Sequence, residues 1–449
     1  MNQHHEHEPG SLGGRRARSR WWAAGLAGMT GLALTTVGVA VLPTADAVAR
    51  TLTTDRPSTG DHRDDKNTND KSKGKKEKKP KGIPVPCEAD KLIAAITLAN
   101  ARGGAVLDLA KDCTYLLTAD IDGAGLPAIT TPITLNGGKH TTIKRAAAVD
   151  EFRILTVEVG GDLTLNHLTI TGGQTDGNGG GVFVNAGGSL AANSSTITRN
   201  VSNRGGGILN LGSAIIINSA MTHNTAQVDG GGIFSRGQIK IIDSFLAHNR
   251  TIINSGGAVA TLGTAVIDRS EITGNHAGNA GGGLVGSGPV VVVKSKIVNN
   301  TSRNNGGGIS APGGVNLTLR QVFVAKNHAG GSGGGVFVNL NNQVTIEDSV
   351  IERNSATGNG GGLTNISTSI LRRTKVTGNQ AEEGGGIYNA ATGTVTLFST
   401  KIIKNTAVTD GGGIFNQAGG TVELNIASGT LVVENLPDNC SGDVPGCAG

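Results

Sequence analysis

The sequence has 449 residues and a formal net charge of +5, with 72 glycines and only 3% aromatic residues. This composition excludes an ordinary globular core, and Gly blocks placed regularly between Val- and Ile-rich runs favour a repetitive solenoid over a disordered chain. The positive charge arises before residue 87, because residues 87–449 hold 24 basic and 25 acidic side chains. A nucleic-acid-binding fold would need basic clusters in its folded part, so we expect no nucleic-acid partner.

Residues 1–49 have the pattern of a signal peptide. Arginines from Arg15 to Arg20 precede an uncharged stretch, residues 21–42, and small-x-small sites follow at Ala45-Asp46-Ala47 and Ala47-Val48-Ala49. The uncharged stretch is nearly long enough to cross a bilayer, so an uncleaved N-terminal anchor stays open as the alternative. We expect membrane contact only through this segment.

Residues 50–86 are predicted to be a disordered linker. The stretch from Arg56 to Lys81 is almost wholly polar and ends in a Lys-rich run at residues 71–81. Without an apolar period, such a segment cannot offset the entropy lost on ordering. It is either a solvated spacer or a tether to an anionic envelope polymer or lipid headgroups.

Residues 87–127 are predicted to form an N-terminal cap and the first strands. A helix is expected over 87–101, because apolar residues recur there at helical spacing, from Ala89 through Leu92 and Ile96 to Ala99. Strands are expected at 106–109 and 115–118. The end of a solenoid exposes open strand edges, and this helix is well placed to cover them.

The four cysteines flank the repeats and lack the spacing of a metal site. After an export signal they predict two local disulfides, one at each end of the solenoid. The expected pairs are Cys87–Cys113 and Cys440–Cys447.

Irregular early coils are expected over 128–172, a regular array over 173–435 and a disulfide-bearing tail over 436–449. In the array, Gly blocks recur every 24–27 residues, and a branched apolar residue follows each block. The blocks begin at Gly179, Gly205, Gly230, Gly256, Gly281, Gly306, Gly333, Gly360, Gly384 and Gly411. Two short strands in each unit, stacked in register, would bury a continuous core. The period therefore predicts an all-β, right-handed parallel β-helix.

An Asn stands five to seven residues before nine of the ten Gly blocks. These residues are Asn200, Asn224, Asn249, Asn275, Asn300, Asn327, Asn354, Asn379 and Asn405. In a stacked solenoid each amide can bond to the next, so we expect a structural Asn ladder at a turn. Triple Gly suits a tight corner with positive φ.

The Asn-to-Gly-Gly-Gly pattern resembles that of bacterial right-handed parallel β-helix repeat proteins of the pectin-lyase-like superfamily. One unit, with Phe245 to Asn249 followed by Gly256-Gly257-Ala258-Val259, is also similar to motifs of polymorphic outer-membrane proteins, which are adhesins. The resemblance covers about residues 87–435. It implies a bacterial protein that is secreted, extracellular or associated with the cell wall, and we expect a monomer.

Aligning the units places side chains in columns along the solenoid. Opposite charges stand one coil apart, which predicts stacked ion pairs of modest stabilising effect. These pairs are Asp243 with Arg269, Asp348 with Arg373, and Glu271 with Lys296. The column before the Asn ladder is a broken basic stripe that could bind an acidic glycan. Its candidate binding residues are Arg199, His223, His248, Lys326, Arg353 and Lys404.

The array contains one acidic cluster, Glu382 and Glu383 with Asp410 one coil further on. Glu383 and Asp410 are candidate ligands for a cation such as Ca²⁺, and we expect no other cofactor and no aromatic side chain beside them. A galacturonan hydrolase would show paired Asp residues and a His-Gly pair, and the array has neither. We therefore assign no catalytic residue.

Two functions follow as hypotheses. The first is an exported or cell-surface protein with a binding, adhesive or structural role, directed at polysaccharide or cell-wall polymer through the linker or a solenoid face. The second is a polysaccharide lyase or glycoside hydrolase that acts on acidic polysaccharide, which depends on fold analogy alone.

Overall fold

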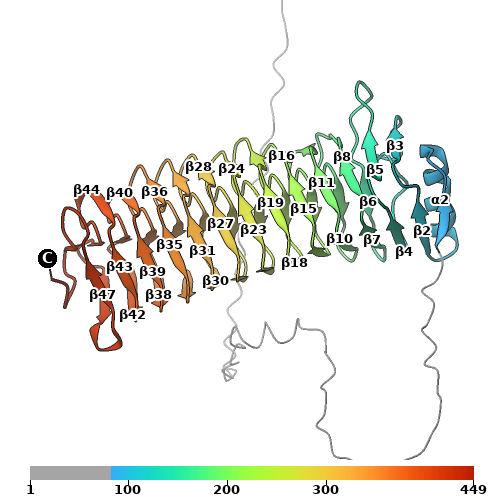
Figure 1. The fold of residues 1–449 in the computed structure, drawn as a ribbon. Helices are drawn as coiled ribbons and strands as arrows, with labels where there is room; N and C mark the ends of the chain where they lie inside the picture. The colour runs from blue at the N-terminus through green and yellow to red at the C-terminus, as the bar shows by residue number, and fades with distance from the viewer. Residues whose placement is uncertain (1–81, 449) are drawn as a thin grey trace, which may run out of the picture. The chain divides into compact units, whose positions relative to one another are not determined.

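The computed structural model describes residues 82–448, which form a solenoid of four parallel β-sheets (Figure 1). The predicted all-β class and parallel β-helix are confirmed. The predicted signal peptide, and the predicted linker up to residue 81, lie outside the described residues. Within residues 82–448, no helix combines the length and apolar character that crossing a bilayer requires.

Helix α2 (Ala89–Ala101) caps the N-terminal end, as predicted, and begins two residues later than expected. It buries Leu92, Ile96 and Ala99 against the first coils. The solenoid itself begins earlier than predicted, because β1 (Ile83–Val85), inside the expected linker, pairs in parallel with β2. Val85 is buried, and its carbonyl accepts a hydrogen bond from the Tyr115 hydroxyl at 2.9 Å. The expected linker boundary at residue 86 was therefore wrong.

Each regular coil passes through the four sheets in turn. Sheet 1 consists of β1, β2 (Ala105–Leu109), β4 (Pro132–Asn136), β7 (Asp162–Asn166), β10 (Ser189–Asn193), β14 (Ser213–Ile217), β18 (Gln238–Ile242), β22 (Ala265–Asp268), β26 (Val290–Val293), β30 (Asn316–Arg320), β34 (Gln343–Glu347), β38 (Thr368–Arg372), β42 (Thr394–Phe398) and β46 (Thr421–Asn425). Sheet 2 consists of β3 (Thr114–Leu117), β5 (Thr142–Arg145), β8 (Thr169–Thr171), β11 (Thr196–Thr198), β15 (Ala220–Thr222), β19 (Phe245–Ala247), β23 (Glu271–Thr273), β27 (Lys296–Val298), β31 (Phe323–Ala325), β35 (Val350–Glu352), β39 (Lys375–Thr377), β43 (Lys401–Ile403) and β47 (Leu431–Val433).

The other two sheets are built from shorter strands. Sheet 3 consists of β12 (Val201–Ser202), β16 (Thr225–Ala226), β20 (Arg250–Thr251), β24 (His276–Ala277), β28 (Thr301–Ser302), β32 (His328–Ala329), β36 (Ser355–Ala356), β40 (Gln380–Glu383) and β44 (Thr406–Asp410). Sheet 4 consists of β6 (Leu155–Val157), β9 (Val182–Val184), β13 (Ile208–Asn210), β17 (Ile233–Ser235), β21 (Val259–Thr261), β25 (Leu284–Gly286), β29 (Ile309–Ala311), β33 (Val336–Val338), β37 (Leu363–Asn365), β41 (Ile387–Asn389), β45 (Ile414–Asn416) and β48 (Cys440–Ser441). A short 3-10 helix, η1 (Ile426–Ser428), lies in the last coil.

The expectation of two strands in each unit was wrong, because a regular unit contains four. Sheets 3 and 4 use strands that are mostly two or three residues long, too short to show the alternation by which strands are recognised in a sequence. The early coils are also more regular than expected, since β4, β5, β7 and β8 join sheets 1 and 2 in register. They differ from later coils in having no sheet 3 strand before β12.

The core is a narrow stack of aliphatic side chains. Alternate residues of each sheet 1 strand point inward, as Leu190 and Ala192 do in β10, and both are buried. The parallel register places Leu190 over Ala214 and then Ile239 on successive coils. Burying one such Leu or Ile side chain stabilises the fold by roughly 1.5–3 kcal/mol. This repeated stacking compensates for the scarcity of aromatic residues.

The nine expected Asn residues form a continuous buried ladder at the turn between sheets 2 and 3. Each side-chain amide donates to the Oδ1 atom of the Asn on the next coil, at 2.9–3.0 Å. The ladder continues beyond Asn405 to Asn435 and Asn439, which the sequence pattern did not reveal. The residue before each of the nine is left-handed, with φ between 50° and 64°. In that conformation the side chain of the preceding residue, where it has one, points outward, while the Asn side chain turns into the core.

Only the first Gly of each triplet has positive φ, between 62° and 71°. The positive φ expected at this corner is therefore present, and it is confined to the first Gly. At the second and third positions neighbouring carbonyls come close: a Cβ on Gly307 would lie 2.5 Å from the Gly334 carbonyl oxygen, and one on Gly308 would lie 2.6 Å from that of Gly335. The third position accepts an Ala once, at Ala258, which is fully buried.

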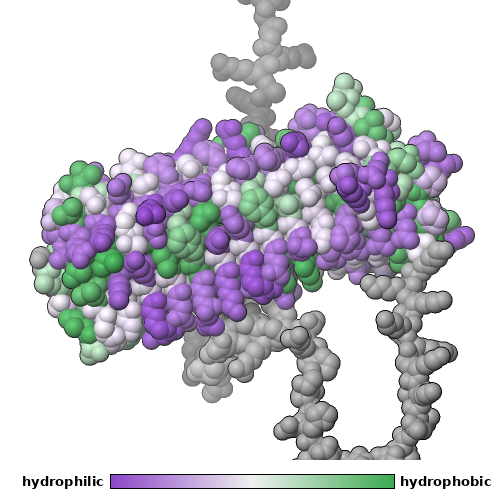
Figure 2. Space-filling model, in the orientation of Figure 1, coloured by the Kyte–Doolittle hydropathy of each residue, from purple (hydrophilic) through white to green (hydrophobic). Residues whose placement is uncertain are grey.

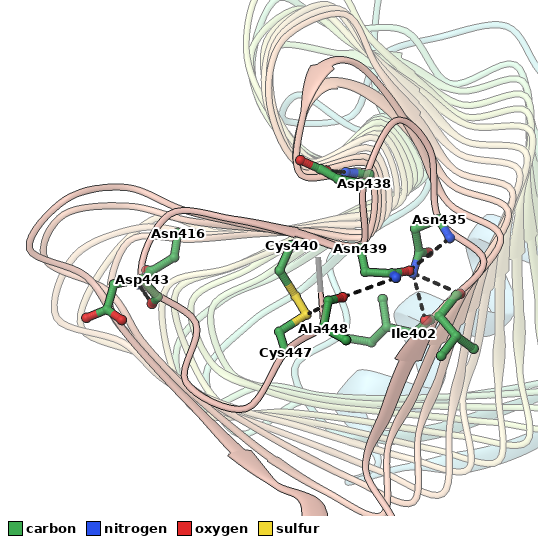
Figure 3. The surroundings of a disulfide bond; sticks show 11 residues. Ile402, Asn416, Asn435, Asp438, Asn439, Cys440, Asp443, Cys447 and Ala448 are labelled. Carbon is green, nitrogen blue, oxygen red and sulfur yellow. Dashed lines mark hydrogen bonds between the residues drawn. A yellow bond between two sulfur atoms is a disulfide. The ribbon is translucent and has the colours of Figure 1, made fainter.

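Both predicted disulfides form, Cys87–Cys113 and Cys440–Cys447. Disulfides persist in oxidising compartments, so the pair indicates such an environment. The second disulfide closes the C-terminal end (Figure 3), where Asn439 donates to the Ala448 carbonyl at 3.2 Å. The expected tail 436–449 includes a strand of the solenoid, because β48 pairs in parallel with β45. The expected solenoid end at residue 435 was too early.

Candidate functional site

The middle residue of each three-residue sheet 4 strand points outward, because its two neighbours enter the core. These middle residues stack in register as one column, which we call the sheet 4 column. It contains Thr156, Phe183, Leu209, Phe234, Ala260, Val285, Ser310, Phe337, Thr364, Tyr388 and Phe415. Five of these eleven residues are aromatic, although the whole sequence has only eight Phe and two Tyr. Half of all Phe and Tyr residues therefore lie in one outward column.

The sheet 4 column is sheltered although it faces outward. The first Gly of each triplet folds the chain against the column residue four positions later. A Cβ on Gly333 would lie 2.7 Å from the Phe337 Cβ, and one on Gly411 would lie 2.7 Å from the Phe415 Cβ. As a result Phe234 is only 4% exposed and Phe337 only 8% exposed. The glycine turns thus pack over one side of the sheet 4 column and bury most of its residues.

Three consecutive small column residues interrupt the aromatic series and leave a cleft of about 380 Å³. Ala260, Val285 and Ser310 form its floor, and Phe234 stands at one end. Its remaining lining residues are Arg204, Asp229, Arg236, Asn254, Ser255, Thr261, Leu262, Asn279, Ala280, Ser287 and Pro312. We call this hollow the sheet 4 cleft. An apolar floor with a rim of amides, hydroxyls and few charges is typical of a small-ligand site.

The charged groups of the sheet 4 cleft gather at the Phe234 end. Arg204 Nε lies 3.2 Å from Asp229 Oδ2, and Asp229 Oδ1 accepts the Ser255 backbone N–H at 3.3 Å. The guanidinium carbons of Arg204 and Arg236 lie 5.7 and 5.9 Å from the centre of the Phe234 ring. Arg236 is exposed and makes no ion pair with any described residue. The cleft thus offers one unpaired guanidinium beside an aromatic ring.

The acidic pair predicted as cation ligands is brought together. Glu383 and Asp410 are register partners on β40 and β44, and the neighbouring Glu382 accepts the Thr409 hydroxyl at 2.9 Å. Within residues 82–448, no group of three or more His, Cys, Asp or Glu side chains is arranged to hold a metal. The structure therefore adds no third acidic or imidazole ligand to the pair.

The expectation that no aromatic side chain lies near this pair was wrong. Tyr388 stacks on Phe415, with ring centres 5.3 Å apart and planes 2° from parallel. Burial raises the pKa of the Tyr388 hydroxyl, and the negative charge of Glu383 raises this pKa further, against a lowering contribution from Asn359. The sequence contained a signal for these rings, since an aromatic residue recurs four positions after the first Gly of five blocks.

The predicted basic stripe is only partly assembled. Its six residues all lie in the left-handed turn position before the Asn ladder, with outward side chains. The rings of His223 and His248 lie 5.2 Å apart and are tilted by 31°. Burial lowers the pKa of His223, and the nearby His248 and Arg199 lower it further. On the later coils, glutamates partly neutralise the stripe: Arg353 pairs with Glu352 at 3.1 Å and Lys404 with Glu434 at 3.6 Å.

Of the stacked ion pairs expected from the alignment, two are present on exposed turns. Arg269 Nε lies 2.7 Å from Asp243 Oδ1, and Arg373 Nε lies 2.6 Å from Asp348 Oδ1. The hydrogen bond from each Arg lowers the pKa of its partner Asp. Glu271 and Lys296 are register partners on β23 and β27, but no ion pair joins their side chains. Figure 2 looks onto sheet 2, where hydrophilic and hydrophobic residues are interspersed.

Comparisons with protein-family models, with curated proteins and with solved structures returned no match. The geometry of the sheet 4 column and its cleft is therefore the basis for a functional assignment.

Proposed function

We propose that the protein binds a glycan in the sheet 4 cleft and along the sheet 4 column, as an exported bacterial β-helix protein of the pectin-lyase-like kind that its sequence resembles. The concentration of aromatic residues in the sheet 4 column carries this proposal. A chain that uses so few aromatic residues places half of its Phe and Tyr in one outward column, where Phe183, Tyr388 and Phe415 are partly exposed. Aromatic rings provide large, rigid apolar contacts of the kind that ligand sites use.

The chemistry of the sheet 4 cleft favours an acidic sugar as the ligand. A volume of about 380 Å³ lies within the range of small-ligand sites. The Asn254 amide nitrogen and the Ser287 hydroxyl could bond sugar hydroxyl groups, and Asn279 holds Asn254 in place by donating to its Oδ1 at 3.3 Å. The unpaired Arg236 guanidinium at the rim suits a carboxylate, which a guanidinium can bind through two parallel hydrogen bonds. The Lys-rich run at 71–81 would add a sequence-independent attraction to an anionic wall polymer.

The lining of the cleft supports binding over cleavage. Glycoside hydrolysis ordinarily uses two carboxylates on either side of the scissile bond. Asp229 is the one carboxylate in the cleft lining, and it is already engaged by Arg204 and by the Ser255 backbone. Release of reducing ends or of unsaturated products from uronate polymers would overturn this preference.

The test is binding of the full chain to acidic and neutral polysaccharides, measured by affinity electrophoresis and calorimetry. Val285→Phe should fill the cleft without disturbing the fold, because Phe already stands at the equivalent positions 234 and 337. We expect this variant and Arg236→Ala each to weaken binding about tenfold, or roughly 1.4 kcal/mol.

The matched control is Phe245→Ala, which removes an aromatic ring that is 40% exposed on sheet 2. It should leave affinity unchanged. Equal losses from Phe245→Ala and Val285→Phe, or full affinity in both cleft variants, would contradict binding in the sheet 4 cleft. Thermal unfolding midpoints close to that of the original protein would verify that each variant is folded.

A further inference from the structure

Another hollow lies where the chain turns from sheet 1 to sheet 2 in the first coils. It has a volume of about 460 Å³. Its lining residues are Lys111, Gly137, Gly138, Lys139, His140, Thr141, His167, Leu168, Thr169, Ser194 and Thr196. We call it the N-terminal basin. Two lysines and two histidines line it, and no carboxylate does, although residues 87–449 are nearly neutral overall.

The N-terminal basin lies at a turn that is longer than those of the regular coils. A regular coil passes from sheet 1 to sheet 2 through two residues, as at His167 and Leu168 between β7 and β8. The coil below it uses five residues, 137–141, between β4 and β5. The extra residues form a shelf that carries Lys139 and His140 beside His167 of the next coil.

Hydrogen bonds hold this shelf in place. Gly137 donates its backbone N–H to the Asn166 carbonyl at 2.7 Å. The Thr141 hydroxyl donates to the Ala110 carbonyl at 2.8 Å and accepts the Gly138 N–H at 3.0 Å. Thr141 is only 1% exposed. The basin is therefore shaped before any ligand arrives, which reduces the entropy lost on binding.

The two glycines of the shelf, Gly137 and Gly138, allow close contacts with neighbouring groups. A Cβ on Gly138 would lie 2.7 Å from Lys111 Cγ, so the Lys111 side chain crosses the shelf at this glycine. A Cβ on Gly137 would lie 2.5 Å from the His167 carbonyl oxygen, so this glycine lets the shelf approach the next coil.

Asp112, which lies beside the shelf, pairs with one of its histidines. Asp112 Oδ1 lies 2.9 Å from His140 Nδ1, and this contact orients the imidazole. The ammonium groups of Lys111 and Lys139 make no ion pair with any described residue. Thr169 and Thr196, register partners on sheet 2, and Ser194 contribute hydroxyl groups to the opposite side.

The geometry points to an oxyanion site in the N-terminal basin, for a phosphate or sulfate ester group. Two lysines and two imidazoles from the first three coils line the hollow together with the hydroxyls of Thr169, Thr196 and Ser194, so several donors can reach a tetrahedral group. A carboxylate presents only two oxygens in one plane. Lysine binds phosphate as a point charge, and Lys111 and Lys139 are suited to that role. This inference is independent of the sheet 4 cleft and holds whether or not a glycan binds there.

Calorimetry of the full chain with inorganic phosphate, sulfate and acetate at low salt tests the site. The decisive variant is Lys111→Gln with Lys139→Gln. Its matched control is Lys75→Gln with Lys76→Gln, which removes the same charge from the linker. We expect the basin variant to weaken phosphate or sulfate binding about tenfold, because charge-assisted hydrogen bonds are lost, and the linker variant to change it less than about twofold.

The three anions distinguish the ligand chemistry. Tighter binding of phosphate than of sulfate assigns a phosphate ester, and the reverse assigns a sulfate ester. Acetate binding as tightly as either would overturn a tetrahedral site. Equal losses of affinity in the basin and linker variants would show that the anion responds only to the overall charge of the protein, which would also overturn the site. Thr169→Val, which keeps the charge, should also weaken binding if the hydroxyl contacts the anion.

Discussion

The side-chain amide of Asn300 donates to Asn327 Oδ1 at 3.0 Å on the next coil, and the same oxygen accepts the Asn300 backbone N–H at 2.9 Å. Both side chains are at most 1% exposed. Each rung of the ladder thus satisfies a buried side-chain donor and a buried backbone donor with one acceptor. Removing a single rung leaves groups without partners on both sides.

Asn300→Ala should therefore destabilise the solenoid by about 2–4 kcal/mol, since each buried group left without a hydrogen bond costs roughly 1–3 kcal/mol. Chemical denaturation measures the loss. Asn316→Ala is the control, because Asn316 is an exposed residue at the start of β30. A loss no larger for Asn300→Ala than for Asn316→Ala would show that the ladder contributes little to stability.

The glycine triplets predict a difference between positions. Gly333→Ala should destabilise by about 2 kcal/mol or more, because an L-residue in left-handed backbone costs roughly 1–2 kcal/mol and its Cβ would also press on Phe337. Gly335→Ala should cost less, because the third position already holds Ala258 in another coil. Denaturant midpoints compare the two variants, and a larger loss at Gly335 would refute this account of the triplet.

The lowered pKa values of two histidines predict that the folded protein is less stable in acid. Burial lowers the pKa of His276, and Arg250 and Arg303 lower it further, while His223 is lowered for similar reasons. A lowered folded-state pKa means that the unfolded chain binds more protons near the ordinary histidine pKa of about 6.5. Stability contributed by the neutral rings is therefore present above that value and lost as the pH falls below it.

Thermal unfolding between pH 7.5 and 5 should show this loss. His276→Thr should reduce the pH dependence, and Thr suits the site because register partner Thr301 occupies the same column. Thr301→Val is the control, because it changes the same column without removing a titratable group. An unchanged pH dependence in His276→Thr would contradict a contribution from His276.

The C-terminal disulfide should protect the last coil more than the middle of the solenoid. In a stacked array each coil contacts only its neighbours, so damage at one end stays local. Cys440→Ser with Cys447→Ser should cost about 2–3 kcal/mol. Hydrogen exchange should quicken at β48 and its neighbour β45 while the amides around Asn300 stay protected. Uniform loss of protection along the chain would indicate that the solenoid unfolds as one cooperative unit.

The sequence alone determined the repeat, the Asn ladder, both disulfides and the capping helix. These features could be predicted because one period repeats throughout, so identical positions must stack once the chain coils. It also contained the aromatic residues of the sheet 4 column, which stand four positions after the first Gly in five of the ten blocks. What it did not reveal was that this column lies outside the core, sheltered by the glycine turns.

Tertiary structure decided which columns are neighbours around the coil. The angles of the turns place Tyr388 and Phe415 near Glu383, and put Arg204 and Arg236 around Phe234. A longer turn at 137–141 creates the N-terminal basin, and the expected tail adds a strand to sheet 4. A period defines positions along the axis of a solenoid, but the turn geometry defines positions around it. The candidate sites on this protein depend on how the turns arrange side chains around the axis.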